Sequence, residues 1–329
     1  MRISTVLISR LFLSLLAAVA PTALSQNVSS QEFPSRTITV VVPFAAGGDA
    51  DIFGRIFAQR LAPALGRAVI VDNRAGASGN LGAEAVVRAA PDGHTILYAS
   101  SALAVSRAAY ANLSFDAERD LAAVSQTVTI PLILAVHSSL PARNVKELLA
   151  LARANPGALA FSGGGTGGLP HLTGELFKLQ TKVDALHVPY KGLGLAQTAL
   201  LSGEVHFAFL SPPVVRAYVS SGRLRALGIS VLERSAALPD VPTLHELGVK
   251  DFEALHWHGF FLPAKTSASV VARLHTEVVK ALAAAEMKER VYAEGATIVG
   301  SSPAELATFF RSETEKWAEV ARRSGTKLQ

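Results

Sequence analysis

The chain has 329 residues, half of them apolar, contains no cysteine, and carries 31 Lys and Arg against 26 Asp and Glu. Without cysteine it has no disulfide, no thiolate chemistry and no lipid on a processed cysteine. The small basic excess is not gathered into stretches with aromatic residues, so we expect no nucleic-acid partner.

Residues 1–25 have the pattern of a secretory signal peptide. Arg2 and Arg10 supply positive charge, and the apolar run Leu11–Ala20 is too short to span a bilayer. Small residues then precede a cleavage position that we expect near Ser25/Gln26, which predicts a soluble, exported protein. An uncleaved membrane anchor is the alternative. The remaining 304 residues (329 − 25) are enough for two domains.

The first part of the mature chain predicts strands and helices in alternation, which is typical of an α/β layer with a parallel sheet. Glycine-rich loops precede both helices. Asp49 or Asp51 is expected to cap the first helix, which Gly66 ends. We expect strands at 36–44, 68–73 and 94–100. We expect a glycine loop and a helix together at 45–66, and a second helix at 81–90.

The same order of elements restarts after a long extended segment at 129–139. A helix with Asn144 as its cap follows that segment, and a second strand, glycine loop and helix come next, around 158–180. The strand at 185–190 and the helix at 191–203 follow, and segments 204–211, 212–222 and 223–230 complete the unit.

A second extended segment, 256–264, leads into a mostly helical tail in which Ser302 and Glu305 have capping-box spacing. Because chain ends usually dock, we expect this tail to pack on the first unit. The sequence therefore predicts two α/β lobes with a cleft between them. Lobe 1 is assigned to 34–128 and 256–329, and lobe 2 to 129–255.

Each lobe has one strand, glycine loop and helix of the same design, at 40–54 and at 159–174. Ligands of open α/β sheets bind at the carboxyl ends of strands, where helix N-termini offer N–H donors and positive dipole ends. Either loop alone is equally consistent with a structural turn. Their matching positions in two lobes favour binding of one small anion.

Nucleotide binding is tested by the residues around the second loop. Gly163, Gly165 and Gly168 fit G-x-G-x-x-G, but the ribose-binding acid should end the next strand, whereas Asp184 precedes it. No Lys-Ser/Thr pair follows the glycines, so a P-loop fails as well. We therefore predict no cofactor.

Spacing gives no evidence for catalysis or for a metal. His256 and His258 would share one face of a strand, but a zinc site needs a third ligand, and none has diagnostic spacing. Ser78 lies in G-A-S-G-N rather than G-x-S-x-G and has no evident base. We predict no catalytic residue and no metal site. A secreted hydrolase or metal-dependent enzyme on a two-lobe α/β scaffold is the alternative to a binding protein.

Several long segments of the chain resemble the substrate-binding proteins of tripartite tricarboxylate transporters, also called Bug-type receptors. They are ITVVVPFAAGGDADIFGRIFAQRL, VIVDNRAGASGNLGAEAVVRAAPDGHTIL, SGGGTGGLPHLTGELF, VPYKG and LPDVPTLHELG, in the family's order over nearly the whole mature chain. The resemblance implies a monomeric periplasmic receptor, not an enzyme, with a type II-like Venus flytrap fold. It also implies a small organic carboxylate as ligand and two integral membrane subunits of a transporter as partners.

The resemblance also implies where the ligand is held, mainly by loop amides, hydroxyls and waters. In lobe 1 the implied contacts are Phe44, Ala45, Ala46, Gly47, Gly48, Asp49 and Asn80; in lobe 2 they are Ser162, Gly163, Gly164, Gly165, Thr166 and His171. Asp51 is expected to support the first turn. Tyr190 is added because it ends a strand where ligands gather.

The chain departs from the family pattern at three places. Ala45-Ala46 stands where the family often has Pro-Pro, and His206 stands where the family has Asp. Lys265 stands at the glycine of the family's P-A-G-T-P hinge motif. A dicarboxylate, a tricarboxylate, an aromatic acid and an acidic amino acid all remain open as ligands.

Overall fold

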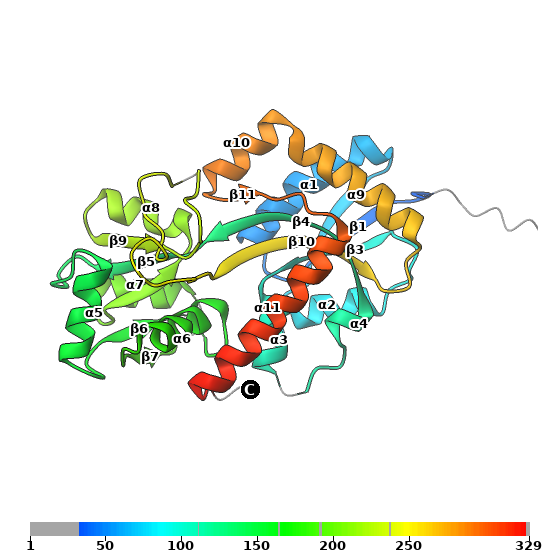
Figure 1. The fold of residues 1–329 in the computed structure, drawn as a ribbon. Helices are drawn as coiled ribbons and strands as arrows, with labels where there is room; N and C mark the ends of the chain where they lie inside the picture. The colour runs from blue at the N-terminus through cyan, green and yellow to red at the C-terminus, as the bar shows by residue number, and fades with distance from the viewer. Residues whose placement is uncertain (1–32, 111, 164, 191–192, 237, 327–329) are drawn as a thin grey trace, which may run out of the picture. The chain divides into compact units, whose positions relative to one another are not determined.

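Two mixed β-sheets covered by helices make up the described part of the chain (Figure 1). The structure is a computed structural model that describes residues 33–110, 112–163, 165–190, 193–236 and 238–326. The predicted signal peptide, residues 1–25, lies outside them. The chain from Phe33 onward forms one unit by its internal contacts. Within the described ranges, every helix is too short or too polar to cross a bilayer.

The first sheet has the strand order β11-β4-β10-β3-β1-β2. As predicted, β1 (Ile38–Val42) pairs in parallel with β2 (Val69–Asn73) and β3 (Thr95–Ser100). The sheet also contains antiparallel strands, which were not predicted. β10 (Leu255–Pro263) lies antiparallel between β3 and β4 (Leu121–Pro131), and β4 also pairs antiparallel with β11 (Thr297–Ile298). Because the chain returns from the second sheet along β10, this strand runs in the direction opposite to that of β4.

The second sheet, of order β7-β6-β8-β5-β9, is mixed in the same way. Strands β6 (Ala160–Ser162), β7 (Leu186–Val188) and β8 (Phe207–Leu210) are parallel neighbours, whereas β5 (Ile133–His137) runs antiparallel between β8 and β9 (Leu224–Ile229). The single extended segment expected at 129–139 is thus two strands in two sheets.

The chain passes between the sheets twice. It leaves the first sheet at the end of β4 and enters the second at β5, with only Leu132 between the two strands. It returns at Leu255, where β10 begins. Both passages lie close to the predicted crossings near 129 and 256. The assignment of every remaining segment to one of two lobes stays a prediction.

The helices mostly follow the predicted pattern. Those of the N-terminal half are α1 (Asp49–Leu65), the 3-10 helix at Ala77–Gly79, α2 (Asn80–Val87), α3 (Ala102–Ala109), α4 (Ala117–Asp120) and α5 (Val145–Ala154). Those of the C-terminal half are α6 (Leu169–Thr181), α7 (Leu193–Ser202), α8 (Pro212–Ser220), α9 (Ala268–Ala283), α10 (Ala285–Ala293) and α11 (Pro303–Ser324). Helices α3 and α4 were not predicted, and neither was the first half of β4.

The predicted capping signals are confirmed at three helix ends and wrong at one. Asn144 accepts a hydrogen bond from the Glu147 amide, and Ser302 and Glu305 form the predicted capping box. Gly66 ends α1 in the left-handed conformation, with φ 65°. The expected side-chain cap of α1 is wrong, because Gly48 is the N-cap and Asp49 is the first helical residue.

The first sheet buries both of its faces, which explains its continuous apolar strands. Along β1, Val40 and Val42 join one hydrophobic cluster while Val41 joins the cluster on the opposite face. Helix α11 connects the cores of the two sheets (red in Figure 1). Its Phe310 packs with the first sheet's core, and its Trp317 packs with the second sheet's core.

Candidate ligand-binding site

A cavity of about 260 Å³ is lined by residues from both sheets. The first-sheet side contributes Phe44, Asp49, Ser100, Ser101, Ala102 and His256, and the second-sheet side contributes Leu132, Leu169, Pro170, Leu193, Gln197, Phe209, Leu210, Ser211 and Val214. A larger cavity of about 480 Å³ lies beside α3, α4 and α11. Its basic side chains are already neutralised, since Arg107 pairs with Glu118 and Arg119 pairs with Asp120.

Four helix N-termini meet at the cavity between the sheets. Helices α1, α3, α6 and α8 follow the carboxyl ends of β1, β3, β6 and β8, respectively. The first residues of all four helices, or the residues just before them, line the cavity. None of the four has a side-chain hydrogen bond at its N-cap, which is Gly48, Ser101, Gly168 or Ser211. Such ends carry partial positive charge and offer backbone N–H donors to an anion.

The rest of the cavity wall is largely apolar. Its apolar side chains include Phe44, Leu132, Leu193, Phe209, Leu210 and Val214. Among the described residues that line it, none is Lys or Arg. An anion bound here would therefore be held by backbone amides and hydroxyls, and its body would contact hydrocarbon.

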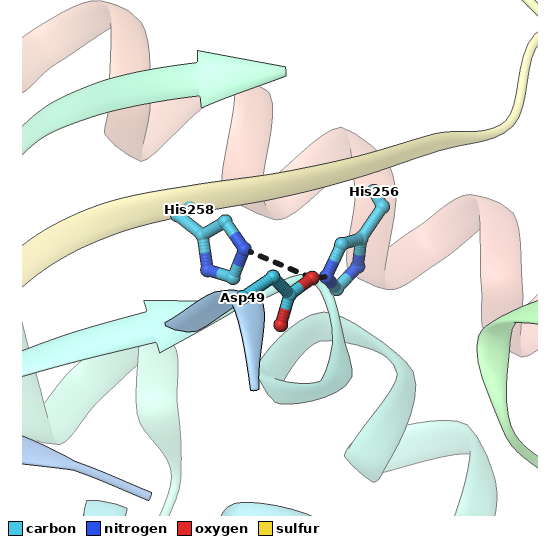
Figure 2. Close-up of side chains that lie close together, drawn as sticks. All are labelled: Asp49, His256 and His258. Atoms are coloured by element: carbon cyan, nitrogen blue, oxygen red, sulfur yellow. Dashed lines mark hydrogen bonds and ion pairs between the residues drawn. The ribbon is translucent and has the colours of Figure 1, made fainter. Parts of the chain in front are cut away.

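Asp49 lies between two histidines on the wall of this cavity (Figure 2). Its Oδ2 is 2.8 Å from Nε2 of His256 and 3.5 Å from Nε2 of His258. Both histidines project from β10 toward Asp49, which confirms that they share one face of a strand. Burial by itself would raise the pKa of Asp49, but the two imidazoles outweigh burial and lower this pKa well below its usual value.

The two imidazoles differ in their surroundings. His258 is completely buried, neither of its ring nitrogens makes a hydrogen bond of good geometry, and burial lowers its pKa. His256 is partly exposed, and its Nδ1 lies 2.7 Å from Oγ of Ser101. One side chain of α1, one of β10 and the serine before α3 are thus joined in a hydrogen-bonded chain.

The first predicted loop reaches the cavity at its two ends. Phe44 and Asp49 line the cavity, while Ala45, Ala46, Gly47 and Gly48 form the exposed turn between them. The predicted support of this turn is confirmed, because the Gly47 amide donates to Asp51 over 2.9 Å.

Asn80 lies close by, at the start of α2. It is buried in a narrow recess that it shares with Phe44, and neither its amide nitrogen nor its amide oxygen has a hydrogen-bond partner.

The second predicted loop lies farther from the cavity than its helix does. The Ser162 hydroxyl donates to the carbonyl of Ala196, and a side chain at Gly163 would collide with the backbone of His171. Gly165 faces open space, and Thr166 lines a small cavity of about 50 Å³ next to Ser78. Gly164 lies outside the described residues.

His171 and Tyr190 do not line the cavity between the sheets. The Nδ1 of His171 accepts a hydrogen bond from the Gly167 amide, and its ring stacks on that of His187 with centroids 3.7 Å apart. Tyr190 packs against the hydrophobic core of the second sheet. These structural roles follow from packing between segments, which local spacing does not report.

Sequence reasoning missed most of the cavity's polar residues. Ser101 and Ser211 each stand just before a helix, and the adjacent serines at 100 and 101 were the available signal. His256 was considered there as a zinc ligand. Its pairing with Asp49 joins residues 207 positions apart, and no sequence pattern predicts it.

Comparison with known proteins shows which family and which fold this architecture belongs to. The sequence model of the family described as "Tripartite tricarboxylate transporter family receptor" matches residues 53–326. The chain is 36% identical to Protein BugT of Bordetella pertussis, over 94% of this chain and 96% of that protein.

Two solved structures are similar over nearly the whole fold. The periplasmic binding protein BugD is 31% identical with a TM-score of 0.76, and R. palustris Rpa4515 with adipate is 31% identical with a TM-score of 0.79. In both comparisons 90% of this chain and 100% of the other are covered. The fold is therefore that of a two-lobe periplasmic binding protein.

Proposed function

We propose, on the premise that this chain belongs to the tripartite tricarboxylate transporter family of receptors, that it is an extracytoplasmic solute receptor. Its ligand is a small organic carboxylate, held in the cavity between the two sheets. It delivers this ligand to the integral membrane subunits of a transporter. Export to the periplasm and removal of the signal peptide near Ser25/Gln26 belong to the same proposal, as does a monomeric state.

The observation that carries the proposal is the meeting of four helix N-termini without side-chain caps on one cavity. Each N-terminus acts as roughly half a positive charge. A carboxylate placed between them exchanges its water for amide donors from both sheets, which would hold the sheets together around it. The adipate bound to the similar R. palustris protein is a ligand of this chemical class.

The apolar wall favours one kind of carboxylate over others. Phe44, Phe209 and Val214 offer no partner for additional charged groups. A second or third carboxylate facing them would lose its water without gaining a hydrogen bond. We therefore expect acids with a hydrocarbon or aromatic body to bind more tightly than a tricarboxylate.

A thermal-shift screen against small carboxylates tests the proposal. A ligand at 100 times its Kd stabilises the folded chain by roughly 2.7 kcal/mol, which raises the melting temperature measurably. The variant Val214→Trp, which fills the cavity, should lose the shift. Ile70→Trp, which enlarges an exposed aliphatic side chain on β2, should retain it. The proposal fails if no carboxylate shifts the melting curve, or if Val214→Trp responds like the wild type.

A second candidate function rests on the chain of Ser101, His256 and Asp49. With Nε2 of His256 held by Asp49, Nδ1 faces the Ser101 hydroxyl as a base, which is the set of roles that a serine hydrolase needs. Receptor function is preferred because the family model that matches residues 53–326 is that of a transporter receptor. Recovery of the bound ligand unchanged supports the receptor. Turnover that Ser101→Ala abolishes would establish the hydrolase.

A further inference from the structure

We propose that Asp49, His256 and His258 bind one divalent transition-metal ion of the Zn²⁺ class, whose open coordination position faces the ligand cavity. The proposal rests on the proposed function in one respect: the ligand's carboxylate completes the coordination of the ion. The three side chains come from the N-terminus of α1 and from alternate positions of β10 (Figure 2).

The geometry of the three side chains is close to that of a metal site. One ligand atom from each residue lies within 4.8 Å of the other two. Metal bonds of about 2.0–2.2 Å at tetrahedral angles place such atoms about 3.3 Å apart. The Asp49–His256 and Asp49–His258 distances of 2.8 and 3.5 Å bracket this value. Only the two imidazoles need to approach each other, and the half-exposed Asp49 side chain is free to adjust.

The burial of His258 is the second observation that points to an ion. A completely buried imidazole normally has a hydrogen-bond partner, yet both ring nitrogens of His258 lack one of good geometry. An ion between His258 and Asp49 would give Nε2 a strong partner. It would also replace the contact of 3.5 Å, which is long for a hydrogen bond.

The surroundings of His256 suit metal ligation. Metal-bound histidines usually donate the N–H of their other ring nitrogen to an oxygen, which fixes the tautomer. The Ser101 hydroxyl lies 2.7 Å from Nδ1 of His256 and can accept that hydrogen bond, which leaves the lone pair of Nε2 for the ion. Two imidazole nitrogens and one carboxylate oxygen favour Zn²⁺, Co²⁺ or Ni²⁺ over Mg²⁺ and Ca²⁺, which prefer all-oxygen ligands.

The ion resolves an electrostatic conflict in the cavity. Asp49 is a carboxylate on the wall of a cavity that is proposed to bind another carboxylate, and the two would repel each other. The N-terminus of α1, for its part, disfavours a cation by itself. A divalent ion and an organic carboxylate together satisfy both groups, so each should raise the affinity of the other. Thermodynamic linkage requires the two effects to be equal.

Titration of the chelator-treated, dialysed protein with ZnCl₂ by calorimetry tests the site directly. We expect one strong site per chain, weakened roughly tenfold or more in His256→Gln and in Asp49→Asn. His245→Gln is the matched control, because His245 forms an exposed pair with Asp251 without a third ligand. Melting curves must show each variant folded. Substituted Co²⁺ should give the visible spectrum of a low-coordinate site in the wild type and in His245→Gln only.

The outcomes separate the metal site from the receptor function. If zinc titrations of wild type and His256→Gln superimpose, or if Co²⁺ keeps the spectrum of the hydrated ion, the metal site is refuted. Carboxylate binding that is equal in excess EDTA and in ZnCl₂ refutes the coupling but leaves the receptor intact. A protein that binds zinc but no carboxylate under either condition retains the metal site and refutes the proposed function.

Discussion

The backbone amide of Gly47 donates a hydrogen bond of 2.9 Å to the carboxylate of Asp51, four residues later in the chain. The same carboxylate accepts hydrogen bonds from Arg55 and from the side chain of Asn73. Burial would raise the pKa of Asp51, but these donors outweigh it and lower the pKa. One buried carboxylate therefore fixes the turn that carries Phe44 and Asp49 to the cavity.

Replacing Asp51 with Ala should destabilise the protein and weaken ligand binding together. The change removes the acceptor of the Gly47 amide, the Arg55 guanidinium and the Asn73 side chain, and because the first two are exposed the cost should be about 1–3 kcal/mol. The loop then loses its fixed conformation, and binding weakens with it. Urea unfolding and calorimetric titration measure the two effects. The control is Asp72→Ala, which breaks an exposed pair with Arg74 and should cost less than about 1 kcal/mol. Equal effects of the two changes would contradict the role assigned to Asp51.

Two glycines of the second loop should respond differently to enlargement. A Cβ at Gly163 would lie 2.4 Å from the backbone nitrogen of His171, so Gly163→Ala should cost about 1–3 kcal/mol of stability. A Cβ at Gly165 meets nothing within 4 Å, so Gly165→Val should change stability by no more than about 1 kcal/mol.

The predicted contact of this loop with the ligand makes the second variant informative. Gly165→Val should weaken carboxylate binding by roughly tenfold, because a branched side chain occupies the space between loop and ligand. Titration of the folded variant measures this. Wild-type affinity in Gly165→Val would show that the loop is only a turn.

Stability should fall as the pH drops below about 6.5, and two stacked histidines should contribute to the fall. Burial, followed by repulsion from His187 and Lys178, lowers the pKa of His171 to about 3, and burial together with repulsion from Lys178 lowers the pKa of His187 to about 4. The nearby Glu175 carboxylate, 3.8 Å from His171, opposes this only in part.

The direction of this change in stability follows from the number of protons that the folded and the unfolded chain bind. Between about pH 6.5 and pH 4 the unfolded chain takes up protons on these histidines while the folded chain does not, so folding becomes less favourable. At pH 5 each histidine contributes a loss of up to about 2 kcal/mol. Urea midpoints at pH 7 and pH 5 should therefore differ less in His187→Asn than in the wild type. His245→Asn, at an exposed position, should keep the wild-type difference between the two midpoints. An equally large difference in His187→Asn would contradict the prediction.

The hydroxyl of Ser230 joins the two passages of the chain between the sheets. It donates to the carbonyl of Ala254, just before β10, and accepts from the amide of Leu132, between β4 and β5. Ser230→Ala leaves both groups buried and unpaired, so it should cost about 1–3 kcal/mol. Ser202→Ala, whose hydroxyl bonds only within its own helix, should cost less than about 1 kcal/mol. Denaturant unfolding of both variants checks the difference, and equal midpoints would rule out the link.

The sequence by itself determined the features that depend on neighbouring residues. The continuous apolar runs predicted β1, β2 and β3, the cap at Asn144 and the Gly66 end were visible as residue types, and the glycine loops marked two of the helix starts on the cavity. Quoted motifs were also enough to indicate the receptor family. Such features follow from backbone sterics, capping and hydrophobic period, which act over a few residues.

Only the tertiary structure decided what the cavity contains. The antiparallel entry of β10 into the first sheet brings His256 and His258 against Asp49, 207 and 209 residues away, and it places Ser101 beside His256. The same packing leads the Ser162 hydroxyl to donate to the carbonyl of Ala196, and its predicted contact with a ligand stays a prediction. Strand direction and register are set by long-range pairing and by burial of both sheet faces, and these are properties of the whole fold rather than of any segment.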